Sequence, residues 1–121
     1  MTAKRNYADH DMIEETVRKI ESRIQSSESI KPERREELLQ LLSKLKSEVA
    51  ELSKTHEEHA QSIAKFTDLS AHEATRTQPN PRSLDHSLQG LRSSVDGFEE
   101  SHPKLVQIVN AISNALSNLG I

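Results

Sequence analysis

The sequence predicts an all-α protein, a long antiparallel helical hairpin that resembles a coiled coil. A shorter N-terminal helix makes a three-helix bundle at one end of it. Along most of the 121 residues, apolar side chains recur at alternating steps of four and three, which is the heptad period of packed helices. Only 33% of the residues are apolar and 2% are aromatic. We therefore expect a thin helical assembly, not a globular core around a deep pocket.

The amino-acid composition also limits the kinds of partner that the protein is expected to bind. The net charge is −3, with Lys and Arg scattered among Asp and Glu, so no basic face is expected to bind nucleic acid. The most apolar stretch, residues 105–121, contains too many polar residues to span a bilayer. A helix lying on a membrane surface is a weaker alternative for residues 104–119, because Lys104 is its only cation. We expect one cytoplasmic domain over residues 1–121, which the absence of cysteine fits.

The first expected helix covers residues 9–26. Asp11 is followed three residues later by Glu14, which resembles a capping box. Apolar residues then follow at helical spacing: Ile13, Val17, Ile20 and Ile24. A serine-rich segment ends the pattern, and Pro32 suits the first turn of the next helix.

The second expected helix covers residues 32–74 and carries one unbroken heptad seam. Two positions of this seam are histidines, and its members are Leu38, Leu42, Leu45, Val49, Leu52, His56, His59, Ile63 and Phe66. Pro79 and Pro81 follow the helix closely. Because proline pushes the preceding residue out of helical geometry, residues 75–81 are expected to form a turn between two long arms.

The second arm is expected to consist of two nearly collinear helices, residues 81–100 and 103–119. Asn80 can cap the first, with Pro81 in its first turn. The apolar steps cross Pro103 without losing phase, which indicates a kink or one tight turn. The seam of this arm is Leu84, Leu88, Leu91, Val95, Phe98, His102, Leu105, Val109, Ile112, Leu116 and Leu119.

One register meshes the two seams. Residues that face each other across an antiparallel hairpin have a nearly constant sum of residue numbers. The seam positions satisfy this rule throughout, within a possible shift of one heptad. The expected facing pairs include Leu42 with Leu116, Val49 with Val109, His56 with His102, His59 with Phe98, and Ile63 with Val95.

The N-terminal helix is too short to cover the whole hairpin. Residues 9–26, 32–52 and 104–119 should form the three-helix bundle, while the other end remains a bare pair of helices. Burying an apolar side chain is worth roughly 1.5–3 kcal/mol, so we expect a homo-oligomer, most simply a dimer. A protein partner is also conceivable. The expected self-association residues are Ile63, Phe66, Leu69, Leu84, Leu88 and Leu91.

The same register brings His56, His59 and His102 to one level, with Glu99 one turn away. Imidazole and carboxylate ligands suit a divalent transition metal such as zinc, and helical bundles often hold such sites. We favour a polar layer without a cofactor, which would fix register and partner choice. Three clustered imidazoles would repel one another when protonated, so association could weaken in acid.

Enzymatic activity is not predicted. The paired carboxylates of the chain have no cleft that would tune their acidity, and no glycine-rich phosphate loop is present. Gly90 and Gly97 lie seven residues apart, on one face of the expected helix. They either weaken the helix locally or let another helix approach closely.

The last part of the chain carries a resemblance. The run Phe98-Glu99-Glu100-Ser101-His102-Pro103, followed by a helix that ends in Ala115-Leu116-Ser117-Asn118-Leu119-Gly120-Ile121, resembles a family of short bacterial helical proteins called domain of unknown function 4404. The resemblance is strongest over residues 98–121. It implies a helical architecture in a bacterial cytosol and no particular activity.

Overall fold

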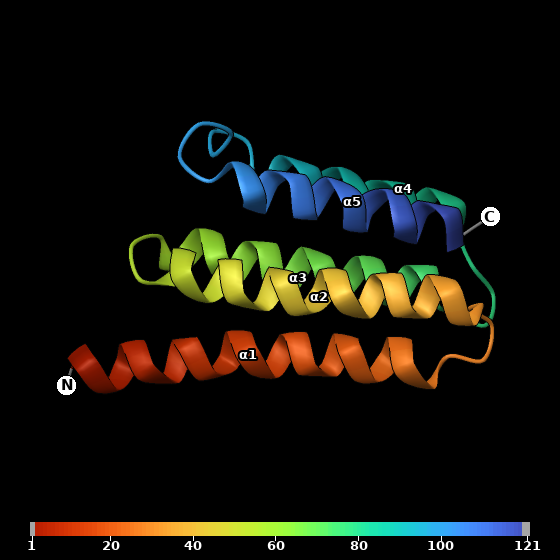
Figure 1. Cartoon of the computed structure of the whole chain (residues 1–121), viewed down its shortest axis with the longest axis horizontal. Coiled ribbons are helices and arrows are strands. Elements are labelled where there is room, and N and C mark those ends of the chain that lie inside the picture. The colour runs from red at the N-terminus through yellow and green to blue at the C-terminus, as the bar shows by residue number, and fades with distance from the viewer. Residues whose placement is uncertain (1, 120–121) are drawn as a thin grey trace.

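The structure, a computed structural model, describes the backbone of residues 2–119 and the side chains of residues 12–119. Within this part of the chain it contains α-helices and no strands, which confirms the all-α class. The helices are α1 (Thr2–Ser26), α2 (Pro32–Ser53), α3 (Glu57–Ala74), α4 (Pro81–Ser93) and α5 (Pro103–Leu119). Successive helices run antiparallel in three layers, with α1 alone, α2 beside α3, and α4 beside α5 (Figure 1).

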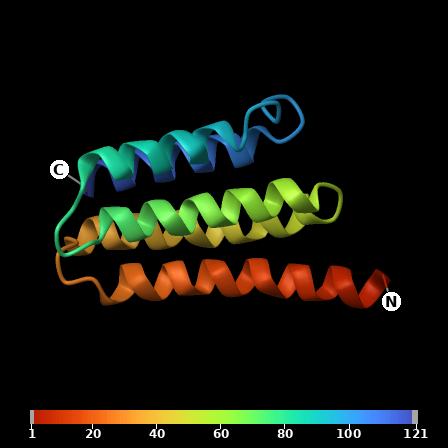
Figure 2. The same cartoon turned by 180° about the vertical axis from the view of Figure 1, so that it is seen from behind.

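The expected single helix over residues 32–74 is wrong. The chain reverses at residues 54–56, and α3 lies antiparallel to α2 (Figure 2). Lys54 still has helical dihedral angles, whereas His56 leaves the helical region with φ −135° and ψ 65°. The reversal folds the end of the hairpin that would have been bare back onto the rest of the chain. Burial of that apolar end is the physical reason for the break.

The expected collinear helices over residues 81–100 and 103–119 are also a wrong prediction. Helix α4 ends at Ser93, and α5 begins at Pro103 and packs antiparallel to α4. The turn between them contains Gly97 at φ 93°, a left-handed conformation that favours glycine. A helix cannot continue through this conformation, and Pro103 lacks the amide hydrogen that a continuous helix would use.

Helix α1 does not form the expected three-helix bundle with α2 and α5. In the described part of the chain it packs against α2 and α3 and makes no contact with α5. It begins at Thr2, earlier than expected, so Asp11 lies inside the helix instead of capping it. It ends at Ser26 as expected. Its buried stripe consists of Ile13, Val17, Ile20 and Ile24.

The residues expected to drive self-association lie mostly inside the folded chain. Ile63, Leu84, Leu88 and Leu91 are at most 5% exposed, and Phe66 packs against the same core. Leu69 differs, since 46% of its surface is exposed, while the neighbouring Ser70 takes the inward position. The expectation of a bare seam is therefore wrong for the folded chain.

Helix α3 contacts each of the other four helices. It can do so because its buried positions are mostly small, so neighbouring helices approach it closely: Ala60, Ala64, Thr67, Ser70, Ala71 and Ala74. Gly90 of α4 provides a second close approach, because a Cβ atom placed there would overlap the ring of Phe66. Close approach is thus the correct explanation for Gly90, whereas Gly97 serves the turn.

We predict that Gly90→Ala lowers the free energy of unfolding. The overlap with Phe66 should cost about 1–3 kcal/mol and outweigh the roughly 0.8–1.0 kcal/mol that alanine gains in a helix interior. Urea unfolding followed by circular dichroism measures the change. In a Phe66→Leu background the same substitution should be neutral or stabilising. An equal loss in both backgrounds would contradict this explanation.

Candidate functional site

The turns at residues 54–56 and 94–102 meet at the same end of the bundle (Figure 1). They are joined there by a cluster of four rings, from His56, His59, Phe98 and His102. The centroid of the Phe98 ring lies 5.3 Å from His56, 5.2 Å from His59 and 5.5 Å from His102, with the rings nearly perpendicular in each pair. Phe98 is 7% exposed and forms the centre of this cluster.

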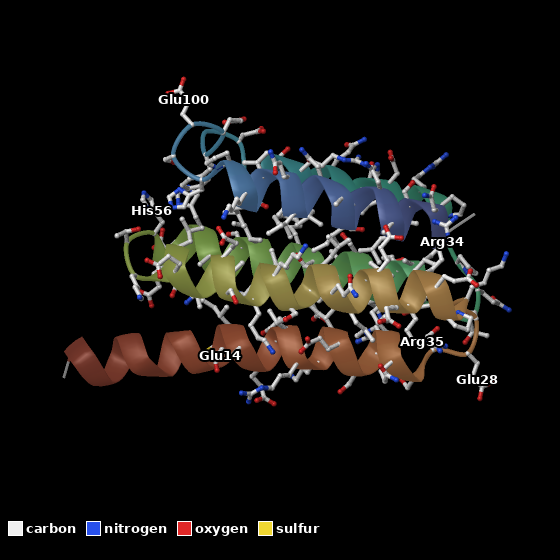
Figure 3. The ribbon with its side chains drawn as sticks, viewed as in Figure 1. Glu14, Glu28, Arg34, Arg35, His56 and Glu100 are labelled. Atoms are coloured by element: carbon white, nitrogen blue, oxygen red, sulfur yellow. The ribbon has the colours of Figure 1, made fainter. Side chains whose placement is uncertain are left out.

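Two of the facing pairs expected from the sequence are present. His56 lies against His102 with 6.3 Å between ring centroids, and His59 lies against Phe98. His56 projects at the end of the bundle, below the turn that carries Glu100 (Figure 3). The register was therefore correct at this level, although the helices on both sides of it turn back.

Local hydrogen bonds orient the polar groups of the cluster. Nδ1 of His56 lies 2.8 Å from the hydroxyl of Thr55, and Nδ1 of His102 lies 2.9 Å from the hydroxyl of Ser101. Glu99 accepts a hydrogen bond of 2.9 Å from the backbone amide of Gly97. Each of these polar side chains thus serves its own turn, and Glu99 stabilises the left-handed glycine.

This arrangement does not form the metal site that the sequence suggested. Zinc needs its nitrogen ligands about 2.0–2.1 Å away and converging on one point, whereas Nδ1 of His56 and Nδ1 of His102 each lie within hydrogen-bonding distance of a neighbouring hydroxyl. Among the described side chains, no group of three or more histidines, aspartates or glutamates could hold one metal ion. His56 and His59 are also exposed, so charge on them would be solvated and not trapped in a buried layer.

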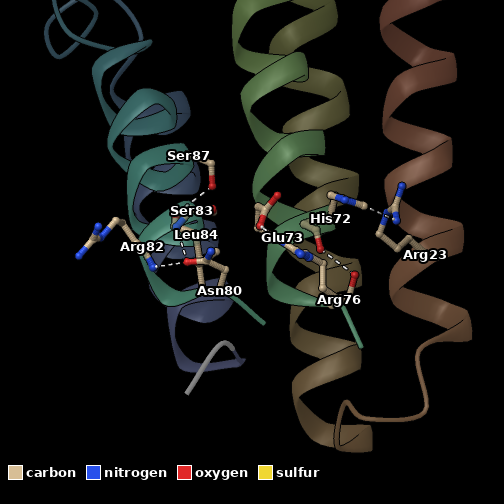
Figure 4. A network of polar contacts seen from close by, with 11 residues as sticks. Arg23, His72, Glu73, Arg76, Asn80, Arg82, Ser83, Leu84 and Ser87 are labelled. Carbon is tan, nitrogen blue, oxygen red and sulfur yellow. Dashed lines mark hydrogen bonds and ion pairs between the residues drawn. The ribbon is translucent and has the colours of Figure 1, made fainter. Parts of the chain in front are cut away.

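A second polar region lies between the C-terminal ends of α1 and α3 (Figure 4). The region contains a shallow cleft, which is lined by Arg23, His72, Thr75, Arg76, Thr77 and Gln78. A guanidinium nitrogen of Arg23 lies 3.3 Å from Nδ1 of His72, and Arg76 pairs with Glu73 at 2.9 Å. Cations at these positions complement the carbonyl ends of helices. The simplest function of this region is structural, because it ties α1 to α3.

Residues 38–121, more than half of the chain, match the family described as Domain of unknown function (DUF4404). The chain belongs to this family. The match confirms the resemblance seen in the last part of the sequence. It includes both turns and the ring cluster of the DUF4404 protein, and it leaves α1 and the first residues of α2 outside. No curated protein and no solved structure gives a significant match.

The length and hydropathy of the described helices indicate whether any of them could span a membrane. None of the helices in residues 2–119 is both long and apolar enough to cross a membrane.

We predict that Phe98→Ala destabilises the DUF4404 protein by about 3 kcal/mol, since a buried ring is lost and with it three ring contacts that join two turns. His59→Ala is the matched control. It removes one exposed ring and should cost less than about 1.5 kcal/mol. Thermal and urea unfolding give both values. Equal losses for the two variants would show that Phe98 is not the centre of the cluster.

We predict that zinc leaves the melting temperature of the DUF4404 protein unchanged, because the three histidines and Glu99 do not converge. Elemental analysis of protein purified without a metal-affinity tag is the second measurement. Stoichiometric zinc that disappears in His56→Leu would contradict the geometry described above.

Proposed function

We propose that this DUF4404 protein is a non-enzymatic helical interaction protein that associates with a second copy of itself in the cytoplasm. The observation that carries the proposal is the heptad seam, which keeps its phase across residues 54–56 and 94–102. Such a period is the signature of helices that pack on other helices. The folded chain buries this heptad seam by turning back on itself. The apolar surface of the seam is therefore complementary to another part of the same sequence.

The polar groups of the bundle support a role without catalysis. The ring cluster is organised around an apolar side chain, and its hydrogen bonds stay within each turn. The cleft between α1 and α3 has its arginines already engaged by His72 and Glu73. A general acid or base needs a carboxylate or imidazole aimed at a substrate position. Neither region provides this arrangement.

We predict a concentration-dependent dimer. Multi-angle light scattering after size-exclusion chromatography should give a mass rising from 13.6 kDa toward twice that value as concentration increases. The protein should first be unfolded and refolded at each concentration, so that slow rearrangements reach equilibrium. A mass of 13.6 kDa at every concentration would contradict self-association.

A further inference from the structure

The two turns divide the helix contacts into two sets. The contacts of α1 with α2, of α2 with α5, and of α3 with α4 do not depend on the turns. If both turns opened, these three contacts would survive. The contacts of α3 with α1, α2 and α5, and of α4 with α5, exist only because the chain folds back. The hairpin formed by α3 and α4 is therefore one unit, and helices α1, α2 and α5 form the other.

Both turns can open at the same end of the bundle. Residues 54–56 are Lys, Thr and His, with no proline or glycine, and Lys54 already has helical dihedral angles. Leu52, His56, His59 and Ile63 keep the heptad phase across this turn, so a straight helix would present the same apolar face. The turn at residues 94–102 precedes Pro103 and can open as an extended link. Short connections between packed elements favour exchange between chains.

We infer that the partner of this chain is a second copy that exchanges the hairpin of α3 and α4, which rests on the proposed self-association. In the dimer, the hairpin of each copy packs on α1, α2 and α5 of the other. The apolar side chains that reach across are the ones buried in the folded chain, among them Ile63, Leu84, Leu88 and Leu91. The exchange needs no new interface, because it re-forms the existing one between two copies.

The face uncovered by opening fits a second copy better than an unrelated helix. The uncovered face of α1, α2 and α5 packs against small buried side chains of α3, including Ala64 and Ala71. Small side chains of this kind let the neighbouring helices approach α3 closely. The rim of the uncovered face also carries a polar contact, because Arg23 of α1 meets His72 of α3 at 3.3 Å. The small side chains of α3 and the contact between Arg23 and His72 both fit helices α1, α2 and α5 of this same sequence. A second copy of the chain provides those helices.

Cross-linking tests the exchange directly. The chain has no cysteine, so introduced pairs are the only thiols. In Arg23→Cys/His72→Cys the pair joins α1 to α3, and exchange places its two members in different copies. The control is Glu21→Cys/Lys46→Cys, which joins α1 to α2. In the native chain Nζ of Lys46 lies 3.4 Å from a carboxylate oxygen of Glu21, and exchange leaves both positions in one copy. Each variant is refolded at high concentration, and its dimer is treated with a short bis-maleimide.

The expected result is covalent dimers on a denaturing gel for the first pair and cross-linked single chains for the control. Cross-links within single chains for both pairs, in a dimer of confirmed mass, would overturn the exchange and leave self-association intact. Covalent dimers from the control pair would mean that α1 is exchanged, which also overturns the inference. A strictly monomeric protein would overturn the proposed function itself.

Variants of the turns provide a second measurement. A Cβ atom at Gly97 would meet nothing within 4 Å, but the residue has φ 93°. Gly97→Ala therefore disfavours only the closed turn, and it should raise the association constant of the dimer at least about fivefold. Inserting three glycines after Lys54 relaxes the other turn and should lower that constant several-fold. No change in either variant would overturn the dependence of association on the turns.

Discussion

The fold depends on burying one apolar seam that is longer than a single pair of helices can cover. A two-helix hairpin would leave the seam half in water along the segment around Ile63 and Leu88. The chain satisfies the requirement by doubling over, so that both arms of the hairpin turn at one level. That level contains the histidines, which are the polar members of the seam. Turning there moves His56 and His59 to the exposed end and leaves the apolar members to form the core.

The sequence predicted the local features of this fold well. The end of α1 at Ser26, the start of α2 at Pro32 and the limits of α5 agree with expectation. Asn80 caps α4 by accepting hydrogen bonds from the amides of Arg82 and Ser83. These features depend on neighbouring residues, and a single sequence records them. The chain reversals were not predictable in the same way, because heptad phase is identical in a straight helix and in one that folds back. Residues 54–56 contain no helix breaker, and the position of α1 depends on where α3 lies.

The ring cluster shows a similar division. Periodicity correctly placed His56 with His102 and His59 with Phe98. It did not show that the phenylalanine would lie at the centre of the cluster, in edge contact with all three imidazoles. Nor did it show that Glu99 would turn to the amide of Gly97, since that bond requires the left-handed turn. A set of ligand-type residues at one level is therefore necessary for a metal site but is not sufficient. In this DUF4404 protein, the same residues close the end of a bundle.

The central place of α3 has a consequence for how the molecule loses its structure. Helix α1 rests on only two neighbours and can fray while the α4 and α5 layer stays folded. Helix α3 has no such freedom, because separating it uncovers surfaces on all four other helices at once. Amide protons of α3 should therefore exchange with solvent more slowly than those of α1, which can exchange through local opening. The helix with the smallest buried side chains thus determines the cooperativity of the whole bundle.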